Sequence, residues 1–349
     1  SASYEIDFWG KNRAAAQSAH YLAAAAHADR DTVALTTLAA VADGYFQVVS
    51  LRERLALAHE NVDAARSLME IVRARYEAGV SNPVEVATQC STLAAAQLTI
   101  PELEQTQAEA LAALALLEGR PPEDFRIAAS SLESLREPAI TPGLPSELLQ
   151  RRPDIINAEA NLRSASADVL VARAALYPSI NLTAAGGVQN PALNAAVTTL
   201  SGVGPTLSLL GGLSQPIFDG GKLRAARAEA QAKEQELVTG YRAAIVSALV
   251  DVEKALSSVQ HLDAARDFQL DNVAQAQRAF DGASLRYKAG YGDYLTALEA
   301  QRLLYTARDL YSQYRLSRLQ ALVSLSKALG GGWQGSVDAP GTAPQIAVR

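Results

Sequence analysis

The segment Pro178-Ser-Ile-Asn-Leu-Thr-Ala-Ala-Gly-Gly-Val188 decides the fold that this sequence predicts. From Ser179 to Ala184, polar and apolar residues alternate with a period of two, which is typical of a β-strand and not of a helix. A cluster of Gly, Asn and Pro follows at residues 186 to 194, and a run of small residues from 197 to 218 predicts the returning strand. We therefore expect a β-hairpin.

The hairpin lies in a long stretch that is almost free of charge. Between Arg173 and Lys222 the only charged side chain is Asp219, although 19% of the whole chain is charged. About eleven residues at ~3.3 Å each, tilted by roughly 45°, span the ~25 Å apolar band of an outer-membrane β-barrel. Tyr177 and Phe218 fall at the same end of the hairpin, where an interfacial aromatic girdle would lie.

A soluble β-hairpin that covers a helical core is the alternative, because alternation is a weak signal. Ala-rich helical stretches on both sides, with no other clear strand pair, favour the membrane interpretation. No apolar run reaches the ~18 residues of a membrane-spanning helix, so we expect any span to be β. The net charge of -6 argues against a nucleic-acid partner, which would require a basic stripe.

The sequence predicts no metal site, redox site, cofactor or enzymatic activity. Cys90, the only cysteine, lies in a helical stretch rich in Ala, Leu and Gln, where we expect a small core residue. No nucleophile lies near a histidine, and there is no phosphate loop or carboxylate pair with metal spacing, so any transport is expected to be passive. The four histidines are scattered without ligand spacing: His20, His27, His59 and His261.

Identical residues recur at an offset of 211 positions, which indicates a tandem duplication. The Arg-Tyr-x-Ala-Gly pentad from Arg75 to Gly79 recurs from Arg286 to Gly290 in the same register. Subtracting the offset places the counterpart of the hairpin before residue 1, apart from a strand end at residues 3 to 9. We therefore expect a longer protein to carry the missing hairpin and a targeting signal, with a lipid-anchoring cysteine as a further candidate.

Each copy predicts two long antiparallel helices joined by a tight turn. In the first copy, residues 11 to 76 lack proline and are rich in alanine, which predicts one long helix or two joined end to end. Gly79 then predicts a helix end, and Asn82-Pro83-Val84-Glu85 predicts the start of the returning helix. Such helices need partners, and a lone hairpin cannot close a barrel, so we expect several copies to associate cyclically.

The sequence thus divides into seven segments. They are a strand end (1–9), a first-repeat helical hairpin (10–119), an irregular belt (120–152), a helix (153–176), a membrane β-hairpin (177–219), a second-repeat helical hairpin (220–329) and a C-terminal tail (330–349).

Four motifs together resemble the TolC-type outer-membrane efflux channels, over essentially the whole chain. The resemblance is strongest to the lipoprotein branch that serves resistance-nodulation-division drug pumps. Besides the two Arg-Tyr-x-Ala-Gly turns, the motifs are Phe218-Asp-Gly-Gly-Lys-Leu-Arg-Ala225, Arg151-Arg-Pro-Asp-Ile155 and Ala328-Leu-Gly-Gly-Gly-Trp333. The chain departs from this pattern in lacking the first β-hairpin.

The resemblance implies a mainly α-helical chain with a membrane β-hairpin. Three chains would form a homotrimer whose transmembrane β-barrel, in contact with outer-membrane lipid, continues into a periplasmic tunnel of long antiparallel helical hairpins. A periplasmic adaptor protein and an inner-membrane resistance-nodulation-division transporter would complete the pump. The channel would be a passive duct for drugs and small molecules, gated at the periplasmic helix tips.

The resemblance also implies roles for individual residues at the helix tips. Glu299 matches an acidic pore position, and three such carboxylates on a threefold axis would bind cations and raise one another's pKa values. An exposed helix glutamate is the alternative. Tyr287 and Glu85 match a gate latch, for which we predict a mutual hydrogen bond in the closed state, or simple packing of Tyr287 at a helix end. A second link does not carry over, because Val84 and Gly292 replace its polar partners.

The adaptor-docking surface is expected at the helix tips, at Arg75, Gly79, Arg286 and Gly290, although the glycines also serve as helix ends. Asp293 is expected to cap a helix rather than line the pore. Two other functions stay open. One is a periplasmic adaptor or other structural coiled-coil protein, which would carry ordinary charged strands. The other is the same channel type serving type I protein secretion.

Overall fold

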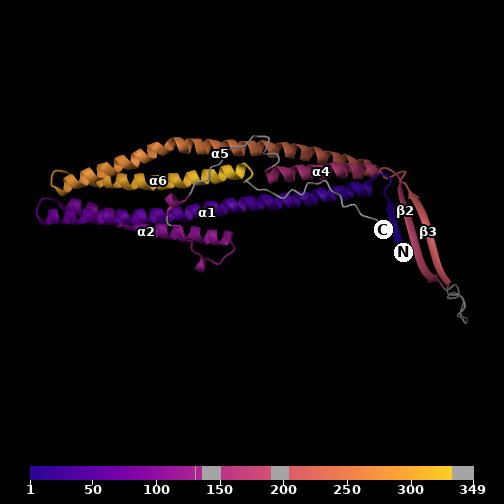
Figure 1. Ribbon diagram of the computed structural model, residues 1–349, viewed down its shortest axis with the longest axis horizontal. Coiled ribbons are helices and arrows are strands. Elements are labelled where there is room, and N and C mark those ends of the chain that lie inside the picture. Colours follow the sequence, from indigo (N-terminus) through magenta and orange to yellow (C-terminus); the bar gives the residue numbers. More distant parts are fainter. Residues whose placement is uncertain (130, 136–150, 190–203, 332–349) are drawn as a thin grey trace. The chain divides into compact units, whose positions relative to one another are not determined.

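The computed structural model describes residues 1–129, 131–135, 151–189 and 204–331 (Figure 1). Helices dominate it, as the sequence predicts. The elements in chain order are β1 (Ala2–Ile6), α1 (Lys11–Glu77), α2 (Pro83–Leu117), the short 3-10 helices η1 (Pro122–Asp124) and η2 (Leu132–Ser134), α4 (Pro153–Ala174), β2 (Ser179–Gln189), β3 (Gly204–Ser214), α5 (Lys222–Lys288) and α6 (Tyr294–Ala328). Residues 190 to 194 of the predicted turn, residues 130 and 136–150 of the belt and the tail after Gly331 lie outside the described residues.

The helix boundaries repeat at the same offset as the sequence motifs. Helices α1 and α5 both have 67 residues, and their first residues, Lys11 and Lys222, lie 211 positions apart. Helices α2 and α6 both have 35 residues and start at Pro83 and Tyr294, again 211 apart. The first helix of each copy is therefore continuous, and the two copies share one pattern of helix starts and ends.

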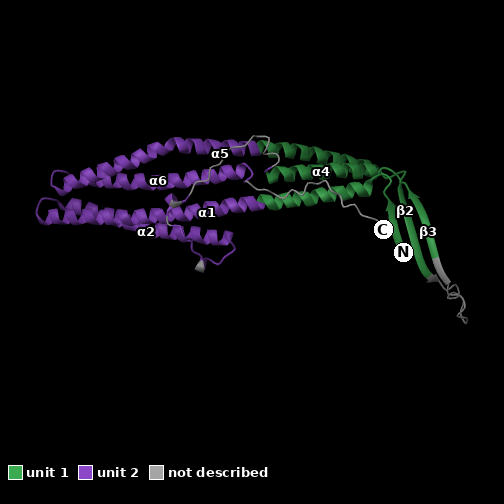
Figure 2. Cartoon of the chain, in the orientation of Figure 1, with its two compact units in different colours: residues 1–32, 152–247 green, residues 33–151, 248–349 purple. Residues whose placement is uncertain are grey.

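The chain forms two compact units, residues 1–32 with 152–247 and residues 33–151 with 248–349 (Figure 2). The first unit contains an antiparallel sheet in the order β1-β2-β3. Tyr4 pairs with Leu182 and Ile180 with Leu213, so apolar side chains of all three strands share one face. Glu5 pairs with Asn181 on the opposite face. The strand alternation predicted from Ser179 onward is confirmed as β2.

Aromatic residues gather where the sheet meets the helices. The ring of Trp9 stacks on Tyr177 at 4.6 Å between centroids, and its indole N–H donates to the carbonyl of Pro178 at 2.9 Å. Phe218, which lies between β3 and α5 in the chain, is 92% exposed. Helix α4 packs against α1, where the buried hydroxyl oxygens of Ser18 and Ser164 are hydrogen-bonded at 2.9 Å.

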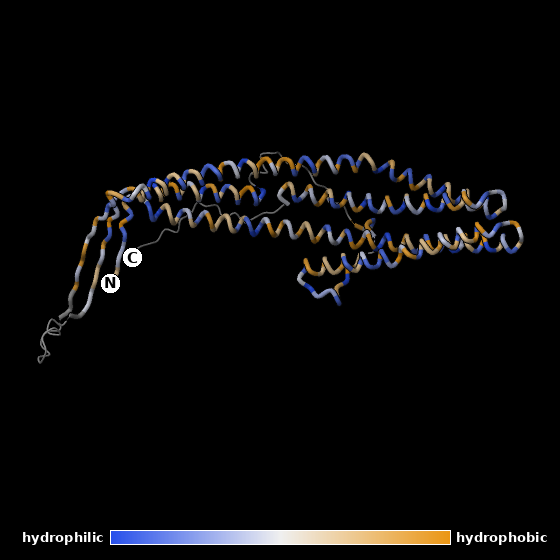
Figure 3. The backbone as a smooth tube through the Cα atoms, turned by 180° about the vertical axis from the view of Figure 1, so that it is seen from behind, coloured by the Kyte–Doolittle hydropathy of each residue, from blue (hydrophilic) through white to orange (hydrophobic). Residues whose placement is uncertain are grey.

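The second unit contains the two helical hairpins, α1 with α2 and α6 with the C-terminal part of α5 (Figure 1). Apolar contacts within each hairpin use small residues, which allow close helix packing. Examples are the clusters Leu51, Ala58 and Leu103 in the first hairpin and Ala276, Leu304 and Ala307 in the second. Hydrophobic and hydrophilic positions interleave along all the helices (Figure 3), as expected for narrow apolar stripes.

The belt packs against the middle of α1. Phe125 is buried with Val48, and Leu132 is buried with Val49. The guanidinium of Arg52 donates to the carbonyls of Ile127 and Ala129, both at 2.9 Å, and so satisfies carbonyls that no helix or sheet uses. These contacts fix residues 125 to 132 to the helix.

The Arg-Arg-Pro-Asp-Ile motif has a structural explanation. Arg152 is 9% exposed and pairs with Asp154 at 2.6 Å, while Ile155 is fully buried. Burial alone would raise the pKa of Asp154, but the hydrogen bond and charge of Arg152 hold that pKa below its usual value. At Gly330, where φ is +88°, an added Cβ would lie 3.0 Å from the carbonyl oxygen of Arg151, so only glycine fits there.

One expectation from the sequence is corrected. Cys90 is exposed on α2 and is not a core residue. Among the described helices, α1 has the length and apolar composition to cross a membrane by those criteria alone, through an 18-residue window of mean hydropathy 1.3. Polar residues divide this window, so it contains no uninterrupted apolar run of 18 residues.

Candidate functional site at the helix tips

Both hairpins turn through the same backbone geometry. Gly79 and Gly290 adopt φ values of +76° and +82°, which favour glycine. Asn82 then accepts a hydrogen bond from the backbone N–H of Glu85 at 3.0 Å, and Asp293 accepts one from Thr296 at 2.9 Å. The predicted role of Asp293 as a helix cap is confirmed. The side-chain hydrogen bond from Thr296, with the backbone bond, lowers the pKa of Asp293 below its ordinary value.

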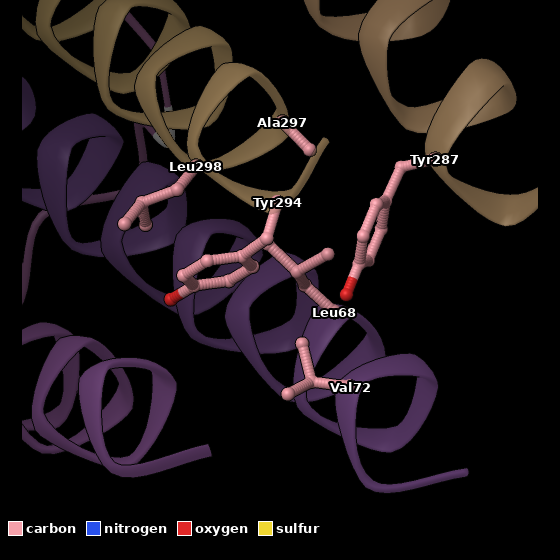
Figure 4. Packing of buried hydrophobic residues seen from close by; sticks show 6 residues of the cluster. All are labelled: Leu68, Val72, Tyr287, Tyr294, Ala297 and Leu298. Atoms are coloured by element: carbon pink, nitrogen blue, oxygen red, sulfur yellow. The ribbon is translucent and has the colours of Figure 1, made fainter. Parts of the chain in front are cut away.

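A buried apolar cluster, here called the tip cluster, joins the two copies beside these turns (Figure 4). The ring of Tyr287 points from α5 toward α1, and the start of α6 packs against the same part of α1 (Figure 4). The exposed fractions are 1% for Tyr287 and 4% for Tyr294, so both aromatic residues are core residues. The cluster consists of Leu68, Val72, Tyr287, Tyr294, Ala297 and Leu298.

A buried hydrogen-bond series crosses from α6 to the first hairpin at this cluster. The hydroxyl of Tyr294 donates to Oε1 of Gln89 at 2.8 Å, and Nε2 of Gln89 donates to the carbonyl of Ala65 at 2.8 Å. Gln89 is fully buried. Burial raises the pKa of Tyr294 to about 12, with further increases from Tyr287 and Glu85, so its hydroxyl keeps its proton at neutral pH. We call this series the tip clamp.

The hydrogen bond predicted between Tyr287 and Glu85 is not formed in this structure. Among the described residues, the buried hydroxyl of Tyr287 has no hydrogen-bond partner, and burial and the charge of Glu85 raise its pKa. The carboxylate of Glu85 instead accepts from Ser81 at 2.6 Å and from Asn82 at 3.3 Å, within its own turn. Local capping therefore occupies the partner that the latch would require.

Arg75 contacts the second copy rather than standing free. Its guanidinium lies 4.8 Å from the centroid of the Tyr287 ring and donates to the carbonyl of Tyr287 at 3.2 Å. The other residues expected at the docking surface, Gly79, Arg286 and Gly290, are exposed at the turns. The structure thus divides the predicted docking set into one residue in a cross-copy contact and three that stay accessible.

Glu299 is exposed on α6, on the face away from the tip cluster. Leu295, one helical turn earlier, shares that face and is 68% exposed. The sequence interpretation missed Gln89 and Tyr294. A signal was available for Tyr294, because it follows the Asp293 cap immediately and begins the period that Ala297 and Leu298 continue. Gln89 carries no such signal, because several glutamines recur along this helix and nothing in the sequence distinguishes the buried one.

Comparisons with known proteins agree on one family. The family model of outer membrane efflux proteins matches residues 1–120 and 144–331. The chain is 47% identical to the pyoverdine export outer membrane protein OpmQ of Pseudomonas aeruginosa over 334 residues, which cover 96% of this chain and 69% of the relative.

Two solved outer-membrane channels share the fold. The structure of the channel OprN matches with a TM-score of 0.87 at 28% identity, over 95% of this chain and 74% of that one. The open state of the MtrE channel from Neisseria gonorrhoeae matches with a TM-score of 0.84 at 30% identity, with the same coverage of 95% and 74%. These values confirm the similarity to TolC-type channels that the motifs indicate.

Proposed function

Because the chain belongs to the outer membrane efflux protein family, and is thus an efflux channel of the outer membrane, we propose that it is the exit duct of a tripartite pump. In this proposal three copies share a transmembrane barrel and a periplasmic helical tunnel. A periplasmic adaptor protein and an inner-membrane resistance-nodulation-division transporter complete the pump. Family membership leaves no support for the alternative of a periplasmic adaptor.

The exposed apolar face of the three-stranded sheet is the observation that carries the trimer. Leu207, Leu209 and Leu213 are 87%, 70% and 72% exposed on β3. Each buried leucine would contribute about 2 kcal/mol, so a folded chain would leave a large apolar surface in water. The sheet also has two edges, β1 and β3, within the described residues. Cyclic association with lipid around it pairs the edges and covers the leucines.

We propose a siderophore as the exported compound. OpmQ, at 47% identity, is named for pyoverdine export, and we extend that class of substrate to this chain. A wide, passive duct imposes little chemical selection, so the transporter and adaptor would select the substrate. Drugs and other small molecules stay within the same proposal as further cargo.

The pore is proposed to narrow at the tips of the second copy. Glu299 and Leu295 are exposed on one face of α6 and are available to meet their equivalents around a threefold axis. Three carboxylates would attract cations, and three leucines would form an apolar constriction. The exposed Gly79, Arg286 and Gly290 would then remain for adaptor docking.

Reconstitution and export assays test the proposal together. The full-length protein in planar bilayers should form trimers and conduct ions. A strain that lacks the gene should retain siderophore in the periplasm, and expression of the intact gene should restore its export. A monomer that gives no conductance in bilayers would overturn the channel assignment. If the protein conducts in bilayers but the strain that lacks the gene exports siderophore normally, only the proposed substrate would be overturned.

A further inference from the structure

The two hairpins meet along a seam that is mostly polar. Ion pairs connect α1 to α6 across it, and their side chains are partly exposed. Two of these pairs are mostly buried and the third is more exposed, so the ion pairs hold α6 to α1 along residues 53 to 60 of α1. The pairs are Glu53 with Arg315 at 3.0 Å, Arg54 with Asp309 at 2.6 Å and Glu60 with Arg308 at 2.9 Å.

Buried apolar contacts between the copies occur at two places along this seam, within the described residues. One is at the belt, where Val49, Leu132 and Leu319 pack together. The other is the tip cluster, which lies beside the turns. The belt contact is purely apolar, whereas the tip cluster is joined to a buried hydrogen bond between the copies. At the tip the two side chains of this bond are both buried and their oxygens lie 2.8 Å apart, whereas Gln301 reaches the side chain of Asn61 at 3.3 Å.

The hydrogen bonds of the tip clamp form only when α6 lies at one position against the first hairpin. Both side chains are buried, and the amide of Gln89 is held by the carbonyl of Ala65, so its oxygen faces Tyr294. If α6 moved along α1, the hydroxyl and the amide oxygen would separate inside an apolar environment. A buried polar group that loses its partner without contact to water is costly, so the clamp resists this movement.

We propose that Tyr294 and Gln89 are positioning residues that hold α6 against the first hairpin and thereby keep the Glu299 constriction narrow. Glu299 follows Tyr294 by five residues, about 7.5 Å along one continuous helix, so a shift at the clamp is transmitted to the pore face. This inference rests on the proposed channel function. Opening at the tip requires the clamp to break, whereas the ion pairs lie farther from the turn, at Arg308, Asp309 and Arg315 on α6.

Conductance of the full-length trimer tests this assignment. Tyr294→Phe removes the hydroxyl and keeps the ring, and we expect about a fivefold higher open probability, which corresponds to about 1 kcal/mol for one buried neutral hydrogen bond. Tyr314→Phe is the matched control, because Tyr314 also lies on α6. Its hydroxyl donates to the carbonyl of Leu262 on α5 at 2.9 Å, so this bond stays within the second copy. The control should lose similar stability and keep the wild-type conductance.

A second variant covers the case in which Tyr294→Phe assembles poorly. Tyr294→Phe combined with Gln89→Met removes both partners, so no orphaned polar atom is left between them. We expect this double variant to assemble as wild type and to conduct as much as the single variant. Wild-type conductance in both Tyr294→Phe and the double variant, or an equal increase in Tyr314→Phe, would overturn the assignment. A wild-type protein that fails to conduct would instead overturn the proposed function.

Discussion

The two helix tips share one backbone but differ in what their side chains do. Gly79 and Gly290 end the long helices with φ values of +76° and +82°. Yet Tyr76, in the first copy, is 47% exposed, and its counterpart Tyr287 is 1% exposed. The duplication therefore preserved the helix ends, while the second copy acquired contacts to the first. Repeated sequence predicts repeated backbone, and it does not predict repeated function.

Substitutions at offset 211 explain this asymmetry. Pro83 starts α2 where Tyr294 starts α6, so the first copy has no hydroxyl at the position of the clamp. Ser81 corresponds to Gly292, whose backbone N–H, together with that of Tyr291, donates to the carbonyl of Arg286. In the first turn Val80 donates to the carbonyl of Arg75 in the same way, so the bond from Gly292 is the addition in the second turn.

Truncation of the two repeated tyrosines should give the largest difference. Tyr287→Ala empties a core position and should lower the free energy of unfolding by about 3 kcal/mol. Tyr76→Ala changes an exposed side chain and should cost less than about 0.5 kcal/mol. Denaturant unfolding of the detergent-solubilised protein measures both values. Equal decreases in the free energy of unfolding would mean that the two tyrosines contribute equally and that the tips are equivalent.

Addition of a methyl group to the turns should give an intermediate effect. At Gly292 an added Cβ would lie 3.0 Å from the backbone nitrogen of Tyr287, so Gly292→Ala should destabilise by about 2 kcal/mol. Ser81 already carries a Cβ at the corresponding position. Ser81→Ala should cost only about 0.5 kcal/mol, through the lost bond to Glu85. Thermal unfolding of both variants checks the order, which a harmless Gly292→Ala would contradict.

The helix caps should give the smallest difference, visible only through pH. Asn82→Ala should cost about 1 kcal/mol at every pH, because an amide does not titrate. Asp293 has a pKa lowered from 3.8, so its capping contribution is fully present above that value and is lost as pH falls through the lowered pKa. Asp293→Ala should therefore differ from wild type in melting temperature at pH 6 and converge with it near pH 2. A difference that persists at pH 2 would argue against charge-dependent capping.

Much of the fold could be predicted because its determinants are local. Gly79, Asn82 and Asp293 act within their own turns, and the strand alternation around Asn181 depends on nearest neighbours. The tip clamp could not be predicted because it joins residues 205 positions apart, Gln89 and Tyr294. Neither residue type indicates burial by itself.

The hydrogen bond predicted between Tyr287 and Glu85 in the closed state is not formed in this structure, for a related reason. Its two residues were assigned by resemblance, but Glu85 also has nearer partners in its own turn, at Ser81 and Asn82. A carboxylate at the start of a helix is stabilised by donors in its own turn, and these compete with a distant hydroxyl. Competition of this kind is visible only once side chains are placed.

The central claim is that the tip of the second copy, and not that of the first, narrows the pore. Block of single-channel current by a trivalent cation applied at the helix tips tests it most directly, in wild type, Glu299→Gln and Glu77→Gln. Both glutamates are exposed near their turns, Glu77 in the first copy and Glu299 in the second. We predict that Glu299→Gln abolishes the block and that Glu77→Gln leaves it intact. Block that survives in Glu299→Gln, or that disappears in Glu77→Gln, would contradict the claim.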